Sequence, residues 1–323
     1  MHRRTLLAGA TLALAMPRLA RAQAGYPERP IRLIVPFPPG GGTDVISREV
    51  GNRMAAATGW TIVADNRPGA GGNIGLDAVA KSAPDGYTIG MGQASNLAIN
   101  ATLYRHMPYD SLRDFAPIGL VAQQPNIVVV AKQSPVHSLA DLLAAARARP
   151  GQLSAGHPGN GTVGHLSGEM LCRVAQVEIT QIPYRGAGPV ITDLVAGRVD
   201  VYSADPLSVR GMLASGDLRG IAVTSATRAR AFPDVPTVAE QGFPGFEAMN
   251  WTGLVAPARL PEPILARLNE EMRKALATPE LIAHLATAGS EPVGSSPAEF
   301  RSKLEAEIAK WGQVVREGNF QVD

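Results

Sequence analysis

The sequence contains one cysteine, Cys172, and therefore no pair that could form a disulfide within the chain. Stability must then come from apolar cores, and because Cys172 lies in the apolar run 170–172 we interpret it as a small buried residue. The sequence also lacks an uninterrupted apolar run of about 18 residues, the pattern of a helix that spans a bilayer. It has no cluster of basic residues, so nucleic acid is not an expected partner.

Aromatic residues make up 5% and charged residues 18% of the 323 residues, whereas hydrophobic residues make up 45%. This profile excludes a disordered chain, and the length is enough for two domains with a core each. The 34 glycines and 26 prolines follow no repeat period, which excludes a collagen-like chain. We interpret them as tight turns between short helices and strands.

The first 22 residues have the pattern of a secretory signal peptide. Arg3 and Arg4 precede an apolar run at 5–16, and the motif Ala-Arg-Ala at 20–22 offers a cleavage site. A buried N-terminal helix is the alternative, and the paired arginines leave both Sec and twin-arginine export open. Cleavage near Ala22 would remove four arginines and no acid, which changes the formal net charge from +2 to −2. We therefore expect a periplasmic protein.

Strand and helix patterns alternate along the chain, as in parallel sheets that are covered by helices. We expect one such unit over 31–91 and a second over 153–202, and the run at 127–130 predicts a strand buried on both faces. A further strand at 221–224 follows, and the pattern from 261 to 322 is helical and amphipathic. The sequence therefore predicts an α/β protein.

Two glycine-rich loops stand where a strand gives way to a helix, at 40–43 and 159–162. The first turn of a helix has unpaired N–H groups and the positive end of the helix dipole, and glycines let an anion approach them closely. The alternative is that the glycines only make sharp turns. Together, the two loops favour an anion site.

Signatures of enzymes are weak. Gly159, Gly161 and Gly164 have the spacing of a dinucleotide loop, but no acid ends the next strand, which closes with 183–185. The serine in 164–168 stands one position too late for a nucleophile elbow, and the histidines and the lone cysteine do not have the spacing of a metal site. A secreted hydrolase or an NAD enzyme is therefore a remote alternative.

Three polar residues near these loops could contact a ligand. His165 could donate to an anion or cap its own helix, and Asp44 could contact the ligand or cap the helix that it begins. Arg185, beside glycines at a strand end, could pair with a carboxylate or remain solvated. The residues alone leave these alternatives open.

Short motifs rich in glycine and proline follow one another along the chain. They lie at 26–30, 36–44, 65–75, 82–88, 182–186, 193–200, 222–225, 233–240 and 251–257. In composition and order they resemble the Bug receptors, the periplasmic solute-binding proteins of tripartite tricarboxylate transporters. The resemblance covers nearly the whole chain after the signal.

The resemblance implies a Venus-flytrap fold of the type II-like class, with two α/β lobes and two crossings between them, near 123–125 and near Thr224. The first lobe is then 23–123 plus 225–323, and the second is 124–224. The resemblance also implies a small carboxylate ligand, membrane transporter subunits as partners, no cofactor, no metal and no catalysis. We expect a monomer.

In the family the ligand lies between the lobes, held by main-chain amides of two facing glycine loops and by water. Carried over by position, one loop is Gly41, Gly42 and Thr43 with Asp44, and the other is Gly161, Thr162 and His165. Further residues expected at the cleft are Ser95, Asn96, Tyr184, Arg185, Gly186 and Asp205. The run Ser-Ala-Asp at 203–205 departs from the expected aromatic or Met residue and could enlarge or polarise the cleft.

The role and the ligand stay open at this point. A receptor that delivers its ligand to a transporter is the first hypothesis, and a ligand-dependent co-receptor for a sensor kinase is the second; neighbouring genes would discriminate between them. Tricarboxylates, dicarboxylates, amino acids and aromatic acids all suit backbone amides.

Overall fold

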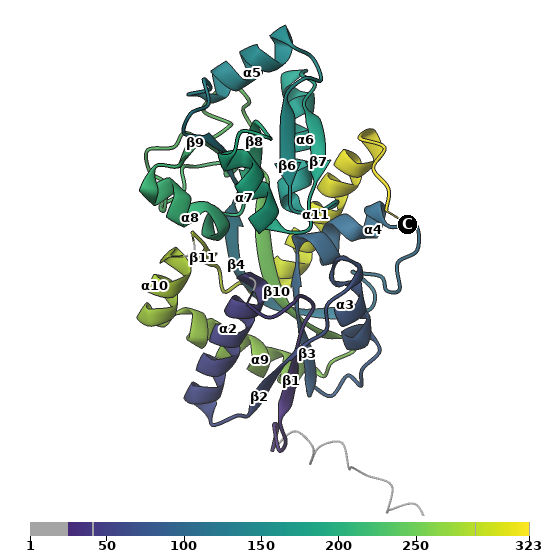
Figure 1. The fold of residues 1–323 in the computed structure, drawn as a ribbon. Coiled ribbons are helices and arrows are strands. Elements are labelled where there is room, and N and C mark those ends of the chain that lie inside the picture. The colour runs from purple at the N-terminus through teal and green to yellow at the C-terminus, as the bar shows by residue number, and fades with distance from the viewer. Residues whose placement is uncertain (1–24, 41, 288, 323) are drawn as a thin grey trace, which may run out of the picture.

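The computed structural model describes residues 25–40, 42–287 and 289–322, and it divides into two lobes, each built around one β-sheet (Figure 1). The predicted signal peptide, 1–22, and Gly41 lie outside the described residues. The mixed α/β, two-lobed fold confirms the predicted fold class.

The sheet of the first lobe combines parallel and antiparallel strands. Its strands follow the order β11-β4-β10-β3-β1-β2 and comprise β1 (Ile31–Val35), β2 (Ile62–Asn66), β3 (Thr88–Gln93), β4 (Phe115–Pro125), β10 (Met249–Pro257) and β11 (Glu291–Pro292). Strand β1 is parallel to β2 and β3, whereas β10 is antiparallel to β3 and β4. The parallel part is the βαβ unit that the sequence predicts.

Helices cover both faces of this sheet. One face packs against α2 (Gly42–Thr58), α9 (Glu262–Leu276) and α10 (Pro279–Thr287), and the other packs against α3 (Asn73–Ala80), which η1 (Ala70–Gly72) precedes, and against η2 (Ala94–Ile99), α4 (Asn100–Leu103) and α11 (Pro297–Glu317). Both faces are therefore apolar, with Leu33 and Met91 in one core and Ile34 and Trp251 in the other.

The sheet of the second lobe has the order β7-β6-β8-β5-β9. Its elements are β5 (Ile127–Ala131), α5 (Leu139–Ala148), β6 (Ser154–His157), α6 (Val163–Ala175), β7 (Thr180–Pro183), α7 (Ala187–Val195), β8 (Val201–Ala204), α8 (Pro206–Ser215) and β9 (Leu218–Val223). Helices α5 and α6 cover one face, and α7 and α8 cover the other. Every residue of β5 is buried, which confirms the strand predicted at 127–130.

The chain passes between the lobes at two adjacent places. Asn126 alone separates β4 in one sheet from β5 in the other. Its backbone N–H donates to Thr224 Oγ1 at 2.8 Å, and that hydroxyl donates to the Ala248 carbonyl at 2.6 Å, just before β10. One threonine therefore ties both crossings together and makes them a single hinge. The predicted bounds of the second lobe, 124 and 224, stay a prediction. Residues 236–238 pair with Val223 of β9, so the chain remains in contact with the second lobe beyond Thr224 before it returns to the first.

One part of the C-terminal prediction is wrong. The pattern from 261 to 322 predicts helix throughout, but between α10 and α11 the structure places β11, which pairs with β4 at the edge of the sheet. Gly289 and Gly294 flank this strand with positive φ angles of 70° and 66°, and Pro292 has no N–H for a helical bond. These residues end the helical pattern locally.

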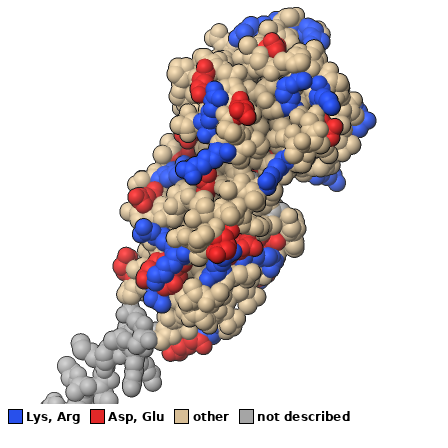
Figure 2. Space-filling view, turned by 90° about the vertical axis from the view of Figure 1, so that its left-hand side faces the viewer, with Lys and Arg blue, Asp and Glu red and all other residues tan. Residues whose placement is uncertain are grey.

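The surface carries charges of both signs. In Figure 2, Lys and Arg lie among Asp and Glu, and this face has no large patch of one sign. Among the described residues, no helix combines the length and the apolar character needed to cross a membrane.

A buried carboxylate fastens α11 to the sheet of the first lobe. Glu307 Oε2 accepts hydrogen bonds from the indole nitrogens of Trp251 on β10 and Trp311 on α11, each at 2.9 Å. Its Oε1 accepts from Lys310 Nζ at 2.6 Å, and Lys303 Nζ lies 3.8 Å away. Burial raises the pKa of Glu307, but the two lysines and the Trp251 N–H outweigh it and hold the pKa below its usual 4.5.

We predict that Glu307→Gln lowers the free energy of unfolding by about 1–3 kcal/mol at pH 7, because the charged partner of buried N–H groups is lost. A lowered folded pKa means that the carboxylate's contribution is complete above about pH 4.5 and is lost as the pH falls through the folded value. Urea unfolding at pH 7 and pH 4 should therefore show a smaller difference at the lower pH.

The matched control is Glu305→Gln, an exposed residue on the same helix, which should leave the unfolding free energy nearly unchanged. A Glu307→Gln difference that is the same at both pH values would contradict the role of the charge.

Candidate functional site

A cavity of about 140 Å³ lies between the two lobes, beside the hinge. Residues from both lobes and the hinge line it: Gln93, Ser95 and Asn250 from the first lobe, Asn126 from the hinge, and Pro158, Thr162, Val163, Gly164, Tyr202, Ser203 and Asp205 from the second. This volume is below the range typical of drug-sized ligands, so the cavity suits a small molecule.

The N-terminus of α6 supplies hydrogen-bond donors to the cavity wall. Thr162 caps this helix, and its Oγ1 accepts from the His165 N–H at 3.2 Å. The next two residues, Val163 and Gly164, line the cavity, and their backbone N–H groups have no acceptor among the described residues. Free N–H groups at the positive end of a helix dipole favour a bound anion.

Gly164 allows α6 to approach β8 closely. A Cβ atom at this position would lie 2.8 Å from the Ser203 carbonyl oxygen and 3.4 Å from Asn126 Nδ2. Any larger residue would push the helix away from the strand and from the hinge. The glycine therefore fixes where the free amides point, as expected for a glycine at an anion site.

A second helical N-terminus belongs to the first lobe. Gln93 caps η2, which continues directly into α4, and its backbone N–H donates to Asn96 Oδ1 at 2.9 Å. Gln93 Oε1 accepts from Thr43 Oγ1 at 2.9 Å, and Gln93 Nε2 donates to Ser95 Oγ at 3.1 Å. Ser95 lines the cavity. Thr43 does not line it but is hydrogen-bonded to Gln93, which does.

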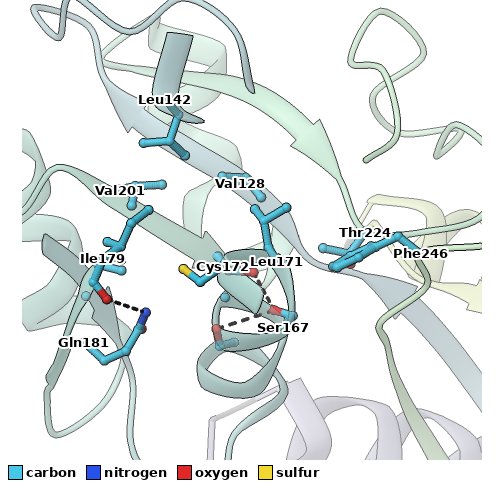
Figure 3. Close-up of a pocket in the computed structure, with 15 residues that line it drawn as sticks. Val128, Leu142, Ser167, Leu171, Cys172, Ile179, Gln181, Val201, Thr224 and Phe246 are labelled. Atoms are coloured by element: carbon cyan, nitrogen blue, oxygen red, sulfur yellow. Dashed lines mark hydrogen bonds between the residues drawn. The ribbon is translucent and has the colours of Figure 1, made fainter. Parts of the chain in front are cut away.

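The serine at 203 makes one wall of the cavity polar. Asn126 Nδ2 donates to the Ser203 carbonyl at 3.0 Å, and Ser203 Oγ lies 2.7 Å from Ser167 Oγ. Behind this pair, inside the second lobe, is a small cavity of about 30 Å³ (Figure 3). Cys172 lines it, and burial raises the pKa of its thiol to about 12, so the thiol is inert at neutral pH.

Asp205 is a charged group at the cavity. It caps α8 through Oδ1, which accepts from the Leu207 N–H at 3.0 Å, while Oδ2 accepts from Gln124 Nε2 at 2.9 Å. Burial raises the pKa of this carboxyl.

Some of the predicted site residues serve the glycine loop itself. Asp44 is buried, and its carboxylate accepts from the Gly40 N–H, Arg48 Nε and Asn66 Nδ2 at 2.8–2.9 Å. Burial raises the pKa of Asp44, but these three donors together lower it. The carboxylate thus braces the loop before α2, and Gly42 stands exposed at the start of that helix.

His165 faces away from the cavity. Its ring stacks on His157 with centroids 4.2 Å apart, and Nδ1 accepts from the Gly161 N–H at 3.3 Å. Burial, and then the neighbouring His157, lower the pKa of His165 to about 4, so the ring is neutral at pH 7. Gly161 lies against Leu103 of the first lobe, where a Cβ would come within 2.1 Å of that side chain.

The remaining predicted residues also lie outside the cavity. Asn96 is fully buried behind Gln93, and the Tyr184 hydroxyl donates to Asp193 Oδ2 at 2.7 Å. Arg185 is exposed, and the Gly186 N–H donates to the Pro158 carbonyl at 3.1 Å. Of the predicted residues, the structure therefore brings Ser95, Thr162 and Asp205 together at the cavity.

Several cavity residues were not predicted from the sequence, among them Asn126, Val163, Gly164 and Asn250. Asn126 had a usable signal, because it stands between the predicted crossing at 123–125 and the predicted strand at 127–130. Asn250 had none. In the part of the chain that the structure describes, no three His, Cys, Asp or Glu side chains are grouped so that they could hold a metal ion.

Comparisons with known proteins agree with this geometry. Residues 46–320 match the model of the tripartite tricarboxylate transporter family receptor. The chain is 38% identical to protein BugT of Bordetella pertussis over 309 residues, which cover 95% of this chain and 94% of BugT.

Two solved structures from Rhodopseudomonas palustris have the same fold. One, solved with adipate, is 38% identical with a TM-score of 0.83 over 92% of this chain and 99% of that chain. The other, MatC with bound malate, is 32% identical with a TM-score of 0.79 over 90% of this chain and 100% of MatC. The chain therefore belongs to the Bug family of periplasmic solute-binding receptors of tripartite tricarboxylate transporters.

Proposed function

We propose that this chain is an extracytoplasmic receptor that captures a small organic carboxylate between its lobes and delivers it to the membrane subunits of a tripartite tricarboxylate-type transporter. The observation that carries the proposal is the pair of unpartnered amides, of Val163 and Gly164, at the wall of a small interlobe cavity. Cleavage of the signal peptide near Ala22 would release the receptor into the periplasm. The relatives solved with adipate and malate support a carboxylate ligand.

The donors at the cavity account for a useful affinity. Hydrogen bonds from amides to a charged carboxylate contribute roughly 1.5–3 kcal/mol each. Two or three such bonds, reduced by the free-energy cost of ordering the ligand and closing the lobes, correspond to about micromolar binding. The hinge at Asn126, Thr224 and Ala248 lets the lobes open for entry and close on the ligand.

The same residues give little support to catalysis. Ser203 has its hydroxyl beside Ser167 and Asn126, with no histidine base in either contact. His165 is neutral and faces away from the cavity. We therefore propose binding and release of the ligand without chemical change.

One prediction of this proposal concerns the ligand. A thermal-shift screen of the mature protein should show a rise in melting temperature with one class of small mono-, di- or tricarboxylates, because a ligand at 100 times its dissociation constant adds about 2.7 kcal/mol. Mass spectrometry of the denatured protein checks beforehand for a carboxylate that copurifies. A protein without copurified ligand that no carboxylate stabilises would contradict the proposed function.

Another prediction of this proposal concerns the α6 amides. Gly164→Ala should weaken carboxylate binding at least tenfold in isothermal titration calorimetry, because the new methyl meets the Ser203 carbonyl and displaces the donors. Gly168→Ala on the same helix is the matched control, since its Cβ would have an ordinary contact of 3.7 Å with Gln181. It should leave affinity unchanged and stabilise the helix slightly. Equal affinities for the two variants would count against the α6 amides as the anion site.

A further inference from the structure

The segment 318–322, which follows α11, is attached to the first lobe and reaches the second lobe at α6 (Figure 1). A hydrogen bond from the Val322 N–H to the Leu103 carbonyl, at 3.0 Å, holds the segment on its own lobe. From this segment the ring of Phe320 contacts the ring of His165 on α6, with centroids 5.2 Å apart and planes at 62°. Phe320 thus joins the two lobes.

His165 connects this contact to the wall of the cavity. It is 6% exposed and stands in the first turn of α6, directly after the two residues whose backbone N–H groups are free. Its N–H donates to Thr162 Oγ1 at 3.2 Å, and its Nδ1 accepts from the Gly161 N–H at 3.3 Å. Because both its backbone and its ring bond to the loop before α6, a shift of the ring would shift the N-terminus of the helix.

A glycine at the end of α11 makes room for the Phe320 ring. A Cβ atom at Gly318 would collide with Cε2 and Cζ of Phe320, so any larger residue would force the ring to move. The φ angle of Gly318 is −81°, which every residue adopts, so its backbone conformation does not require glycine. The glycine therefore serves the position of the ring.

An ion pair lies next to this contact, about two turns further along α6. Arg173 Nη1 donates to Glu317 Oε2 on α11, and Glu317 Oε1 accepts from Gln313 Nε2 at 2.7 Å. Both charged partners are exposed, and an exposed ion pair contributes little by itself. The contact of Phe320 with the buried His165 is therefore the main connection between α6 and the end of α11.

We propose that Phe320 is a positioning residue for the cavity, which holds the N-terminus of α6 against the first lobe before a ligand binds. This inference rests on the proposed function and adds a residue to the same binding process. Phe320 is not among the described residues that line the cavity, so it acts through His165. A site that is ordered beforehand loses less of its interaction free energy to ordering, and it binds more tightly for that reason.

Distances between the lobes test the proposal without a ligand. Spin labels at Lys81→Cys in the first lobe and Arg149→Cys in the second, both exposed positions, report the interlobe distance by double electron–electron resonance in protein freed of ligand. Phe320→Ala should broaden the distance distribution, because α6 loses its contact with the first lobe. Phe320→Leu keeps an apolar side chain and should resemble the wild type. A wild-type distribution in Phe320→Ala overturns the proposal.

A double-mutant cycle assigns the effect to the ring. In calorimetric titrations with malate, adipate and succinate, Phe320→Ala and Gly318→Ala should each weaken binding of the tightest of these acids at least threefold. Gly318→Ala should have no further effect in the Phe320→Ala background, because no ring is left to displace. Arg316→Ala, an exposed residue of α11, is the control and should leave the affinity unchanged.

Two outcomes of the cycle overturn the positioning role. One is an unchanged affinity in Phe320→Ala, and the other is losses that add in the double variant. If none of the three acids binds the wild type, the same cycle is read from the label distances, where Gly318→Ala should broaden the distribution only when the ring is present.

Failure of this inference is distinct from failure of the proposed function. If the distances are unchanged in Phe320→Ala while the wild type binds a carboxylate, the receptor role stands and the positioning role falls. If no carboxylate of the thermal-shift screen binds the ligand-free wild type, the receptor role fails, whereas the distances still decide whether Phe320 holds α6 against the first lobe.

Discussion

The close approach of α6 to β8 at Gly164 is the contact on which the binding cavity depends. A carboxylate that leaves water needs donors that are already aimed at it, and among the described cavity residues no lysine or arginine supplies them. Under the proposed function the donors are backbone amides, which cannot change direction toward a ligand as a side chain can. The direction of these N–H groups is set by the packing of α6 on the sheet, which is close because residue 164 is a glycine.

The two connections between the lobes lie next to each other at the cavity. Thr224 hydrogen-bonds to both crossing segments, so the two connections between the lobes are held together at one point. Contacts between the lobes flank this point on two sides: Gly161 lies against Leu103, and Gly289 lies against Pro206. The N-terminus of α6 and Ser95 line one cavity, so residues of both lobes are positioned to contact the same ligand.

The sequence predicts the scaffold well and side-chain directions poorly. The buried strand β5, the βαβ unit of the first lobe and the helix after the glycine loop at 159–162 follow from local patterns that longer-range packing does not override. The direction of His165 is different: a residue two positions into the first turn of a helix can face the cavity or the neighbouring strand, and stacking on His157 decides this. Strand β11 is also beyond local patterns, because its two residues are extended only by pairing with β4.

Under the proposed function, recognition by the backbone also explains how one fold can receive different acids. Backbone amides bind a carboxylate group and make no contact with the rest of the ligand. Discrimination between different acids must therefore come from the few side chains around the amides. The end of β8 is well suited to this, since alternate residues of a strand point to opposite faces. Ala204 packs into the core with Val209, while Ser203 and Asp205 line the cavity, so changes at these two positions can alter the ligand without disturbing the core. In this chain these positions place a hydroxyl and a carboxyl group at the cavity beside the N-terminus of α6.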